Sequence, residues 1–510
     1  MMPSRNRVST SKSIPAPVGG LNARDAVANM PPTDAIIMDN WFPETASVRV
    51  RNGYLNWSTG LPGTVETLMT YANGYGRKLF GVSGNAFYDC TTKGAVGAPL
   101  VTLQSNSRWQ HANFGTLGGQ YLYAVNGIDY PQIYNGTAWQ QVTGTSTPFA
   151  ITGVDPRLFS NVTVHKSRLW FVERNSFRAW YLDSSSVGGA AHLFDVSPLF
   201  KMGGYLTQMI TWTINNGITI SDYSVFVSSE GEVALYVGSD PASASTFALS
   251  GMFRIGRPIG KRFNAKLGSD QILVCLDGFF PLSKALATDR SAKEAAVSDK
   301  IIQLANNDTA AYNVNFGWHI VFHPISNKLI INVPANGQTY QYVMNTITGA
   351  WCRFTGWNAL CFESFGDQLM FGGNGIVAWC DTGSMDDTLP IISDLKPAFS
   401  YFGSKSNKQF TMVRPLMQVN AKLDLRIDLN TDFQDVSPKS NPNISGLQGT
   451  AWNVARWNTS SWQSGASLRS DWQSVFGIGF AATLRMRCIT KNQTTSLQSI
   501  DYVYQQGGIL

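Results

Sequence analysis

The sequence has 510 residues, and its length and composition indicate a large, β-rich protein. At roughly 100–200 residues per domain, two to four domains are expected. Charged residues make up 14% and aromatic residues 12%, and there are 47 Gly and 22 Pro. This composition excludes a disordered chain and a coiled coil, and it favours many short strands joined by tight turns over long helices. We therefore predict an all-β fold.

The net charge of +6 is unevenly distributed along the chain. Residues 1–24 carry four basic residues and no acid, which gives +4. Residues 396–510 carry 12 basic and 6 acidic residues, which gives +6 and leaves −4 for residues 25–395. Positive charge this dilute does not predict a dedicated nucleic-acid-binding protein.

Neither a membrane-spanning segment nor a secretory signal peptide is predicted. The apolar runs fall well short of the roughly 18 residues that a membrane span needs. The first 20 residues contain no apolar stretch of the roughly 7–15 residues that a signal peptide has, so we expect folding in a cytoplasm. The cysteines are scattered without CxxC spacing, which predicts reduced, mostly buried thiols. They are Cys90, Cys275, Cys352, Cys361, Cys380 and Cys488.

The N-terminal region divides into a basic arm and a segment without a core of its own. Residues 1–18 are polar and basic, as expected for a flexible arm. In residues 19–63, a Pro-Pro-Thr-Asp sequence can start a short helix over residues 35–40. This segment contains Trp41 and Phe42, which must be buried against something. The partner is either the rest of the same chain or a neighbouring molecule.

Residues 64–395 contain recurring units of strand, turn and strand. The units recur at roughly 40–50 residues, which is typical of propeller blades. The best single blade signature is the YxxNxxTGxW pattern at residues 342–351. We predict a β-propeller whose blade number stays open, with a helical insertion near residues 283–306; a stack of sandwiches is the alternative. Strand pairs are expected at residues 78–88, 120–139, 168–183, 328–351 and 368–379.

The composition changes at about residue 396, and a second, sandwich-like or platform-like β domain is predicted over residues 396–510. This part of the chain contains no Glu. Residues 424–430 and 482–488 alternate between apolar and polar, as half-buried strands do. Tryptophans followed by Asn or Gln are interpreted as aromatic loop anchors, with stacking on sugars or bases as the alternative. These tryptophans are Trp452, Trp457, Trp462 and Trp472.

No catalytic, cofactor-binding or metal-binding site is predicted. His319 and His323 are expected on one face of a strand, about 13 Å apart, too far to hold one metal ion directly. The sequence lacks the motifs of zinc proteases, α/β-hydrolases, P-loop proteins and EF-hands. Two groups of acids could supply a glycosidase pair, although solvated turn acids are the plainer interpretation. The groups are Asp222, Glu230 and Glu232, and Asp381, Asp386 and Asp387.

Three groups of sequence strings resemble one family, the tail nozzle or tail tubular protein B of short-tailed, podovirus-like bacteriophages. The first group is residues 17–25 (PVGGLNARD), 30–43 (MPPTDAIIMDNWFP) and 48–53 (VRVRNG). The second is residues 231–241 (GEVALYVGSDP) and 253–262 (FRIGRPIGKR). The third is residues 401–415 (YFGSKSNKQFTMVRP) with the tryptophans described above.

The resemblance implies a non-enzymatic virion protein that folds in the cytoplasm of the host bacterium. Nozzles of this family are homohexameric rings, with propellers facing outward and β domains that build a tube below the tail adaptor, or head-to-tail connector. DNA passes transiently through the lumen, and fibres or spikes attach to some members. The coreless segment is then the candidate assembly interface. Its candidate residues are Gly20, Asn22, Arg24, Asp25, Asp39, Asn40, Trp41 and Phe42.

Two other functions stay open at this point. A carbohydrate-cleaving tail protein would depend on a carboxylate such as Glu232. A propeller lectin or receptor-binding module would depend on an aromatic side chain such as Trp457.

Overall fold

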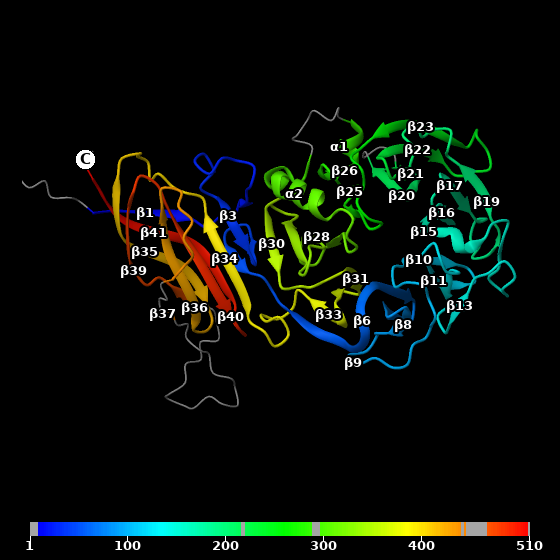
Figure 1. Ribbon diagram of the computed structural model, residues 1–510, viewed down its shortest axis with the longest axis horizontal. Coiled ribbons are helices and arrows are strands. Elements are labelled where there is room, and N and C mark those ends of the chain that lie inside the picture. The colour runs from blue at the N-terminus through cyan, green and yellow to red at the C-terminus, as the bar shows by residue number, and fades with distance from the viewer. Residues whose placement is uncertain (1–8, 216–219, 288–295, 440–442, 445–466, 508–510) are drawn as a thin grey trace, which may run out of the picture.

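The computed structural model describes residues 9–215, 220–287, 296–439, 443–444 and 467–507, and most of these form β-strands. Figure 1 shows two lobes side by side, a ring of sheets that forms a β-propeller and a terminal domain of curled, facing sheets. The predicted all-β fold, with a propeller and a sandwich-like domain, is confirmed. Within the described ranges, no helix is long and apolar enough to cross a bilayer.

Seven blades follow one another around the propeller in this part of the chain, each an antiparallel sheet. The first two contain β6 (Tyr54–Asn73, second half), β7 (Gly76–Ser83) and β8 (Ala86–Asp89), and β10 (Gln110–Thr116), β11 (Gly119–Val125), β12 (Gln132–Tyr134) and β13 (Trp139–Gln141). The third and fourth contain β15 (Phe159–His165), β16 (Arg168–Glu173), β17 (Arg178–Tyr181) and β19 (His192–Asp195), and β20 (Leu206–Asn215), β21 (Ile220–Ser228), β22 (Glu232–Gly238) and β23 (Phe247–Arg254).

The last three blades complete the ring. They contain β24 (Asn264–Leu267), β25 (Asp270–Cys275) and β26 (Gly278–Pro281); β27 (His319–His323), β28 (Lys328–Val333), β29 (Tyr340–Asn345) and β30 (Trp351–Thr355); and β31 (Cys361–Phe365), β32 (Gln368–Gly372), β33 (Asn374–Cys380) and the first half of β6. Smaller elements lie between blades: β9 (Gly94–Ala95), β14 (Ile151–Thr152), η1 (Pro156–Leu158) and β18 (Gly189–Ala190).

The blades pack on one another through apolar faces, because a single four-stranded sheet cannot bury both of its faces. Between the first and second blades, Phe80, Trp109 and Tyr134 belong to one buried cluster. In the third blade, the rings of Phe159 and Phe171 stack with centroids 4.3 Å apart. The expected strand pairs lie in these blades, and in the β16–β17 hairpin Trp170 faces Tyr181.

The long strand β6 closes the propeller ring. Its first half, from Tyr54, pairs with β33 as the outer strand of the seventh blade. Its second half, from Val65, pairs with β7 as the inner strand of the first blade. Gly60 has a φ of +80° near the crossing, a conformation that glycine adopts readily. Main-chain hydrogen bonds therefore join the two ends of the ring, and the propeller begins at Tyr54, ahead of the expected residue 64.

Short helices accompany the three-stranded fifth blade. Helix α1 (Leu282–Ala287) and helix α2 (Ile302–Tyr312), which η3 (Asp299–Ile301) precedes, pack on its strands. The predicted insertion near residues 283–306 is thus helical at both of its described ends, and residues 288–295 lie outside the described residues.

A ten-stranded sheet, sheet B, runs from the sixth blade into the terminal domain. Its order is β27-β28-β29-β30-β3-β34-β40-β36-β37, with β2 beside β3. Strand β3 (Asp34–Asp39) lies parallel to β30 and antiparallel to β34. The predicted helix over residues 35–40 is therefore wrong, because pairing with two distant strands overrides the local helix-start signal. The other strands are β2 (Gly20–Leu21), β34 (Ile391–Pro397), β36 (Leu423–Thr431), β37 (Asn443–Ile444) and β40 (Ala482–Thr490).

A second sheet, sheet A, completes the terminal domain. It contains β1 (Ser9–Pro15), β4 (Trp41–Pro43), β5 (Val48–Val50), β35 (Lys408–Val419), β38 (Ser467–Arg469), β39 (Gln473–Gly479) and β41 (Thr495–Gln506). The expected flexible arm is wrong for residues 9–15, which pair along β41 from Gln505 to Ser499. The predicted alternation of β36 is confirmed, since Leu425 and Ile427 are buried and Arg426 is exposed.

Candidate functional site

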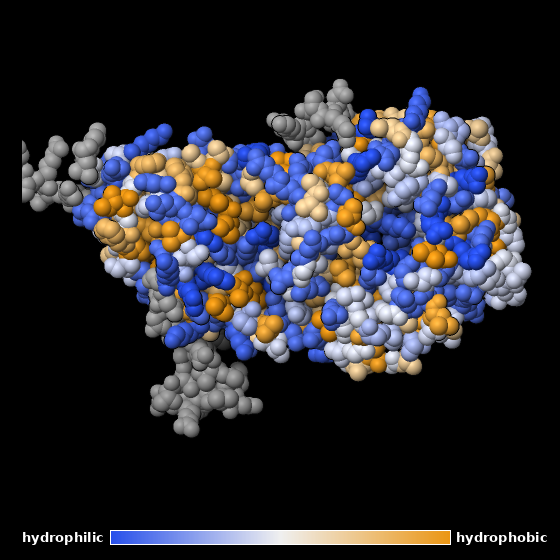
Figure 2. Space-filling view, viewed as in Figure 1, coloured by the Kyte–Doolittle hydropathy of each residue, from blue (hydrophilic) through white to orange (hydrophobic). Residues whose placement is uncertain are grey.

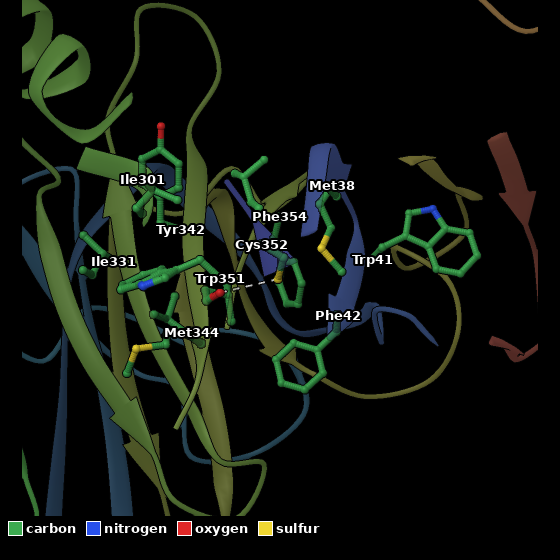
Figure 3. Packing of buried hydrophobic residues seen from close by; sticks show 14 of the residues in the cluster. Met38, Trp41, Phe42, Ile301, Ile331, Tyr342, Met344, Trp351, Cys352 and Phe354 are labelled. Carbon is green, nitrogen blue, oxygen red and sulfur yellow. Dashed lines mark hydrogen bonds between the residues drawn. The ribbon is translucent and has the colours of Figure 1, made fainter. Parts of the chain in front are cut away.

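The eight assembly-interface candidates lie in one region, the seam, which we define as residues 16–53 between the two lobes. Trp41 and Phe42 are 0% and 4% exposed. Figure 3 shows the two side chains pointing away from each other, as neighbours in a strand do, with Phe42 turned toward Phe354 at a ring distance of 6.3 Å. Both side chains are thus covered by the same chain.

The GGLNARD string forms a loop that docks on the helical insertion. The Asn22 amide nitrogen donates to Asp34 at 2.8 Å and to Asp25 at 2.9 Å, while its oxygen accepts from the Arg24 and Asp25 backbone N–H groups. The Lys300 ammonium donates to Asp34 at 2.9 Å. Asn22 and Asp34 are both buried. These contacts tie the start of the chain to the propeller.

Gly20 has to be glycine in this arrangement. Its φ is +85°, and a Cβ there would lie 2.6 Å from the carbonyl oxygen and 2.7 Å from the nitrogen of Trp351. The nearby Trp351 side chain is buried and donates its indole N–H to the Val297 carbonyl at 2.9 Å. The glycine therefore allows the chain to approach the backbone of β30.

Arg24 and Asp25 form the solvent-facing part of the same loop. Arg24 pairs with Asp25 at 2.8 Å and also contacts Asp299. The hydrogen bond from Arg24 lowers the pKa of Asp25, with a further contribution from Asn22. Because Arg24 keeps 43% of its side-chain exposure, this pair adds little to stability on its own.

Asn40 and Arg51 form a buried polar cluster at the centre of the seam. Arg51 is fully buried and binds both oxygens of Asp386, at 2.8 and 2.6 Å. Its Nε donates to the Asn40 amide oxygen at 2.8 Å, and the same oxygen accepts from the Thr355 backbone N–H. The Asn40 amide nitrogen donates to the Ile392 carbonyl at 2.7 Å. One amide thus connects blade six, the seam and β34.

Two further ion pairs lie beside this polar cluster. Arg353 binds both oxygens of Asp39 at 2.7 Å, which raises the pKa of Arg353 further. Lys328 and Asp381 lie 2.5 Å apart with side chains 1% and 5% exposed, and the Lys328 ammonium sits over the Phe42 ring. Burial lowers the pKa of Lys328. Burial opposes ionisation of Asp381 as well, yet the Lys328 charge outweighs it and keeps the pKa of Asp381 low.

The polar contacts of the seam join the two lobes. Its ionised side chains are engaged by opposite charges or by hydrogen bonds, and the central ones are shielded from water. Breaking one partner of such a buried pair is costly, because the other charge stays buried and unpaired. The arrangement can therefore hold two lobes in a fixed relation.

The tryptophans of the terminal domain divide into two groups. Trp452, Trp457 and Trp462 lie outside the described residues. Trp472, expected to anchor a loop by burial, keeps 36% exposure and carries the Arg414 guanidinium over its ring at 4.5 Å.

The candidate glycosidase acids are each held by neighbouring groups. Asp222 binds Lys166 at 2.5 Å and Thr213 at 2.7 Å, and Glu230 pairs with Arg257. Glu232 is 9% exposed and accepts from the backbone N–H groups of Lys201 and Met202. Asp386 binds Arg51 of the seam, Asp381 binds Lys328, and Asp387 accepts from the Asn56 N–H at 3.4 Å. These contacts account for the six carboxylates in structural terms.

The histidines and cysteines are placed as the sequence indicates. His319 and His323 lie on β27, and His319 Nδ1 accepts from the Phe362 N–H at 3.1 Å. All six cysteines are buried, which confirms the prediction of buried thiols. Burial raises the pKa of Cys90 and of Cys361 to about 12, so neither is a ready nucleophile at neutral pH.

Sequence reasoning missed a cluster of basic side chains at the centre of the propeller. In Figure 2, hydrophilic residues gather around the centre of this lobe. The only available sequence signal was the FRIGRPIGKR string at residues 253–262, which concentrates positive charge. The other basic residues of the cluster, Arg108 and Arg174, come from separate turns.

Comparison with known proteins finds only distant structural similarity. No family model and no curated protein matches this chain. A crystal structure of BBS1N in complex with ARL6DN, soaked with mercury, matches with 11% identity and a TM-score of 0.39, over 65% of this chain and 97% of that chain. The structure of YCF48 bound to D1 peptide matches with 12% identity and a TM-score of 0.36, over 69% and 98% of the two chains.

Proposed function

We propose that this chain is a structural subunit of the tail nozzle of a short-tailed bacteriophage, a ring-shaped conduit through which DNA leaves the virion. The strings at residues 17–53, 231–262 and 401–415 support this family by resemblance. The observation that carries the proposal is sheet B, which joins the propeller and the terminal domain without a flexible linker. A conduit that stays sealed while DNA moves through it needs subunits whose two lobes keep a fixed relation to each other.

In the proposed ring, six copies contact one another through their terminal domains. One edge of sheet A is formed by β38 and β39 beside β35, and the other edge includes β1 beside β41. Neither β39 nor β1 has a further strand partner among the described residues. On β39, Phe476 is 76% exposed and Ile478 is 56% exposed. Exposed apolar side chains on an open edge strand favour contact with another chain. Contact between two unlike edges is head-to-tail, and such contacts close into rings.

The outer face of sheet B suits the wall of a DNA channel. On β36 and β40, Arg426 faces Arg487, and Asp428 faces Arg485. Asp394 binds Arg485 at 2.8 Å, so acids and bases alternate on this face. Because the affinity for duplex DNA grows with each neutralised phosphate, a wall of mixed charge lets the duplex slide.

The proposal has defined partners and a defined location. The protein is a virion component, its ring docks below the tail adaptor, and fibres or spikes can attach to its outward-facing propellers. Its contacts with DNA are transient and non-specific, and these roles require no cofactor.

Negative-stain electron microscopy of the full chain, alone and mixed with the tail adaptor from the same phage, tests the proposal. Six-fold rings with an axial channel in either sample are the expected result. Monomers or trimers in both samples would contradict it.

A variant of the β39 edge tests how the ring forms. The double substitution Phe476→Asp and Ile478→Asp places charges in the proposed contact, so the ring population should fall by about tenfold or more. Leu117→Asp is the control, because Leu117 is also an exposed apolar residue, at 108%, but lies on the propeller. Mass photometry of both variants with the adaptor measures the ring population. Equal loss in both variants would place the contact elsewhere.

A further inference from the structure

The propeller contains a central cleft that the nozzle function does not use. It consists of two adjoining hollows, with volumes of about 530 and 400 Å³, which share Arg174, Gly260, Lys261 and Asn313 in their linings. Both volumes are in the range of small-molecule sites, roughly 300–1,000 Å³. The lining comes from the starts of inner strands and from turns of several blades, so the cleft lies at the centre of one propeller face.

The cleft carries a strong excess of positive charge. Its linings include Arg108, Arg174, Arg257, Lys261 and Arg262, whereas Glu230 is the one carboxylate among them. Glu230 is already bound by Arg257. Arg174 is exposed and has no carboxylate within ion-pair distance in the described part of the chain. Arg108 also binds a carboxylate, Glu66, at 3.1 Å, so Arg174, Lys261 and Arg262 are the cations of the cleft that form no ion pair within the described ranges.

Two of these cations are held in place by neutral groups. Arg262 donates to the Glu66 carbonyl at 3.0 Å, to the Thr67 hydroxyl at 2.9 Å and to the Trp109 carbonyl at 3.0 Å. Lys261 donates to the Ser160 carbonyl at 3.3 Å. Carbonyl and hydroxyl oxygens orient these side chains and leave their net charge in place.

Lys261 is the cation of the cleft whose pKa responds to the neighbouring positive charges. Its side chain is open to the hollow, yet protein surrounds the hollow on its sides. Burial by this surrounding protein, with repulsion from Arg174 and Arg262, lowers the pKa of Lys261 to about 8. A bound anion would remove this repulsion and would gain charge-assisted hydrogen bonds.

The remaining lining is rich in groups that bind hydroxyls. Planar amides and a hydroxyl group can each donate and accept hydrogen bonds, which suits a ligand with many hydroxyl groups. The side chains concerned are Asn106, Gln110, Asn175, Asn313 and Thr207. The amide of Asn126, which also lines the cleft, is already bound by Asp129 and by backbone N–H groups.

We infer that the central cleft binds an acidic saccharide, with its oxyanion between Arg174, Lys261 and Arg262 and its hydroxyl groups on the surrounding amides. The oxyanion is a carboxylate or a phosphate, since both match the fork of an arginine. The inference does not depend on ring formation, and it uses neither the tryptophans of the terminal domain nor the candidate glycosidase acids.

Isothermal titration calorimetry of the full chain tests this site with defined probes. The first pair is a tetragalacturonate and its fully methyl-esterified form, which has the same scaffold without the charges. The second pair is glucose 6-phosphate and glucose, with inorganic phosphate as a further control. We expect at least one charged saccharide to bind and its neutral partner to bind at least tenfold more weakly.

Variants separate the cleft from general surface charge. Arg174→Gln and Lys261→Met should each weaken binding by about tenfold or more. Arg178→Gln is the matched control, because Arg178 lies on β17 of the third blade, is 52% exposed and is absent from both linings. Its affinity should equal that of the unaltered protein. Circular dichroism of each variant establishes that its fold is retained.

Four results would overturn the inference. They are no binding of either charged saccharide, equal binding of the neutral partners, unchanged affinity in both cleft variants, and inorganic phosphate binding as tightly as the charged saccharides. Ring formation can succeed or fail in each of these cases, so failure here is distinguishable from failure of the nozzle proposal.

Discussion

The propeller and the seam are both buried β structures, but different forces hold them together. In the propeller, blades made of neighbouring strands pack through apolar and aromatic faces, as in the cluster around Phe80 and Trp109. In the seam, buried charges do much of the joining, and Arg51 meets Asp386 across 335 residues of sequence. The difference shows that local repeats build the ring, whereas distant polar contacts fix the ring to the terminal domain.

Removing the charge of Arg51 is expected to have the largest effect. Arg51→Met leaves Asp386 buried without its partner, which should cost about 3–5 kcal/mol of unfolding free energy. Adding Asp386→Leu should recover part of this loss, because no unpaired charge then remains. Urea unfolding measures each value. Arg157→Gln, which breaks an exposed pair on the propeller, is the control and should leave the midpoint unchanged; an equal effect of both changes would contradict the comparison.

Trp41→Ala should lower the free energy of unfolding by a similar amount, but it should also change the shape of the unfolding transition. Deleting a fully buried tryptophan costs about 3–5 kcal/mol. Trp170→Ala, in a cluster confined to the propeller, should cost about as much. In differential scanning calorimetry, only Trp41→Ala should split the unfolding transition into two, because only it weakens the joint between the lobes. Splitting in the Trp170 variant alone would refute this assignment.

The stability of the propeller should fall as the pH drops below 6.5. Burial, with help from Lys166 and against the Asp222 charge, lowers the pKa of His165 to about 4. Between pH 6.5 and pH 4 the unfolded chain binds a proton that the folded chain does not, so acid favours unfolding.

His165→Gln tests this contribution. The variant keeps a hydrogen-bonding group near the Thr211 hydroxyl, to which His165 Nδ1 is hydrogen-bonded at 3.1 Å. Thermal unfolding between pH 7.5 and pH 4.5 should therefore show a shallower pH dependence than in the unaltered protein. An unchanged slope would mean that other groups, such as the buried His323, account for it.

Gly20→Ala tests whether close backbone packing in the seam requires glycine. Both Gly20 and Gly349 have positive φ, so alanine at either position costs about 1–2 kcal/mol for the backbone alone. Only at Gly20 would the new Cβ also meet the backbone of Trp351. The midpoint of thermal unfolding should thus fall further for Gly20→Ala than for Gly349→Ala. Equal losses would show that β30 can move aside.

Much of the propeller could be predicted from the sequence because its blades are local. The strand pairs at residues 168–183 and 328–351 lie where alternation and turn residues place them. The helix expected over residues 35–40 was wrong, since the pairing of β3 is decided by β30 and β34, which local patterns cannot identify. For the same reason, the arm at residues 9–15 became a strand only through β41.

The candidate site was predictable only in part. Burial of Trp41 and Phe42 followed from their size, but their partners did not. The charges of Arg51 and Lys328 are indistinguishable in sequence from surface charges, and only the fold buries them. The central cleft was missed for a related reason: its cations come from separate turns that the ring brings together.

A three-dimensional reconstruction of the chain bound to its tail adaptor, by single-particle cryo-electron microscopy, tests the central claim most directly. The account predicts six copies around an axial channel. It also predicts that each copy fits the density as one rigid body, with the propeller and the terminal domain in the relation that sheet B sets. A ring whose two lobes have to be placed separately, or an assembly without an axial channel, would contradict it.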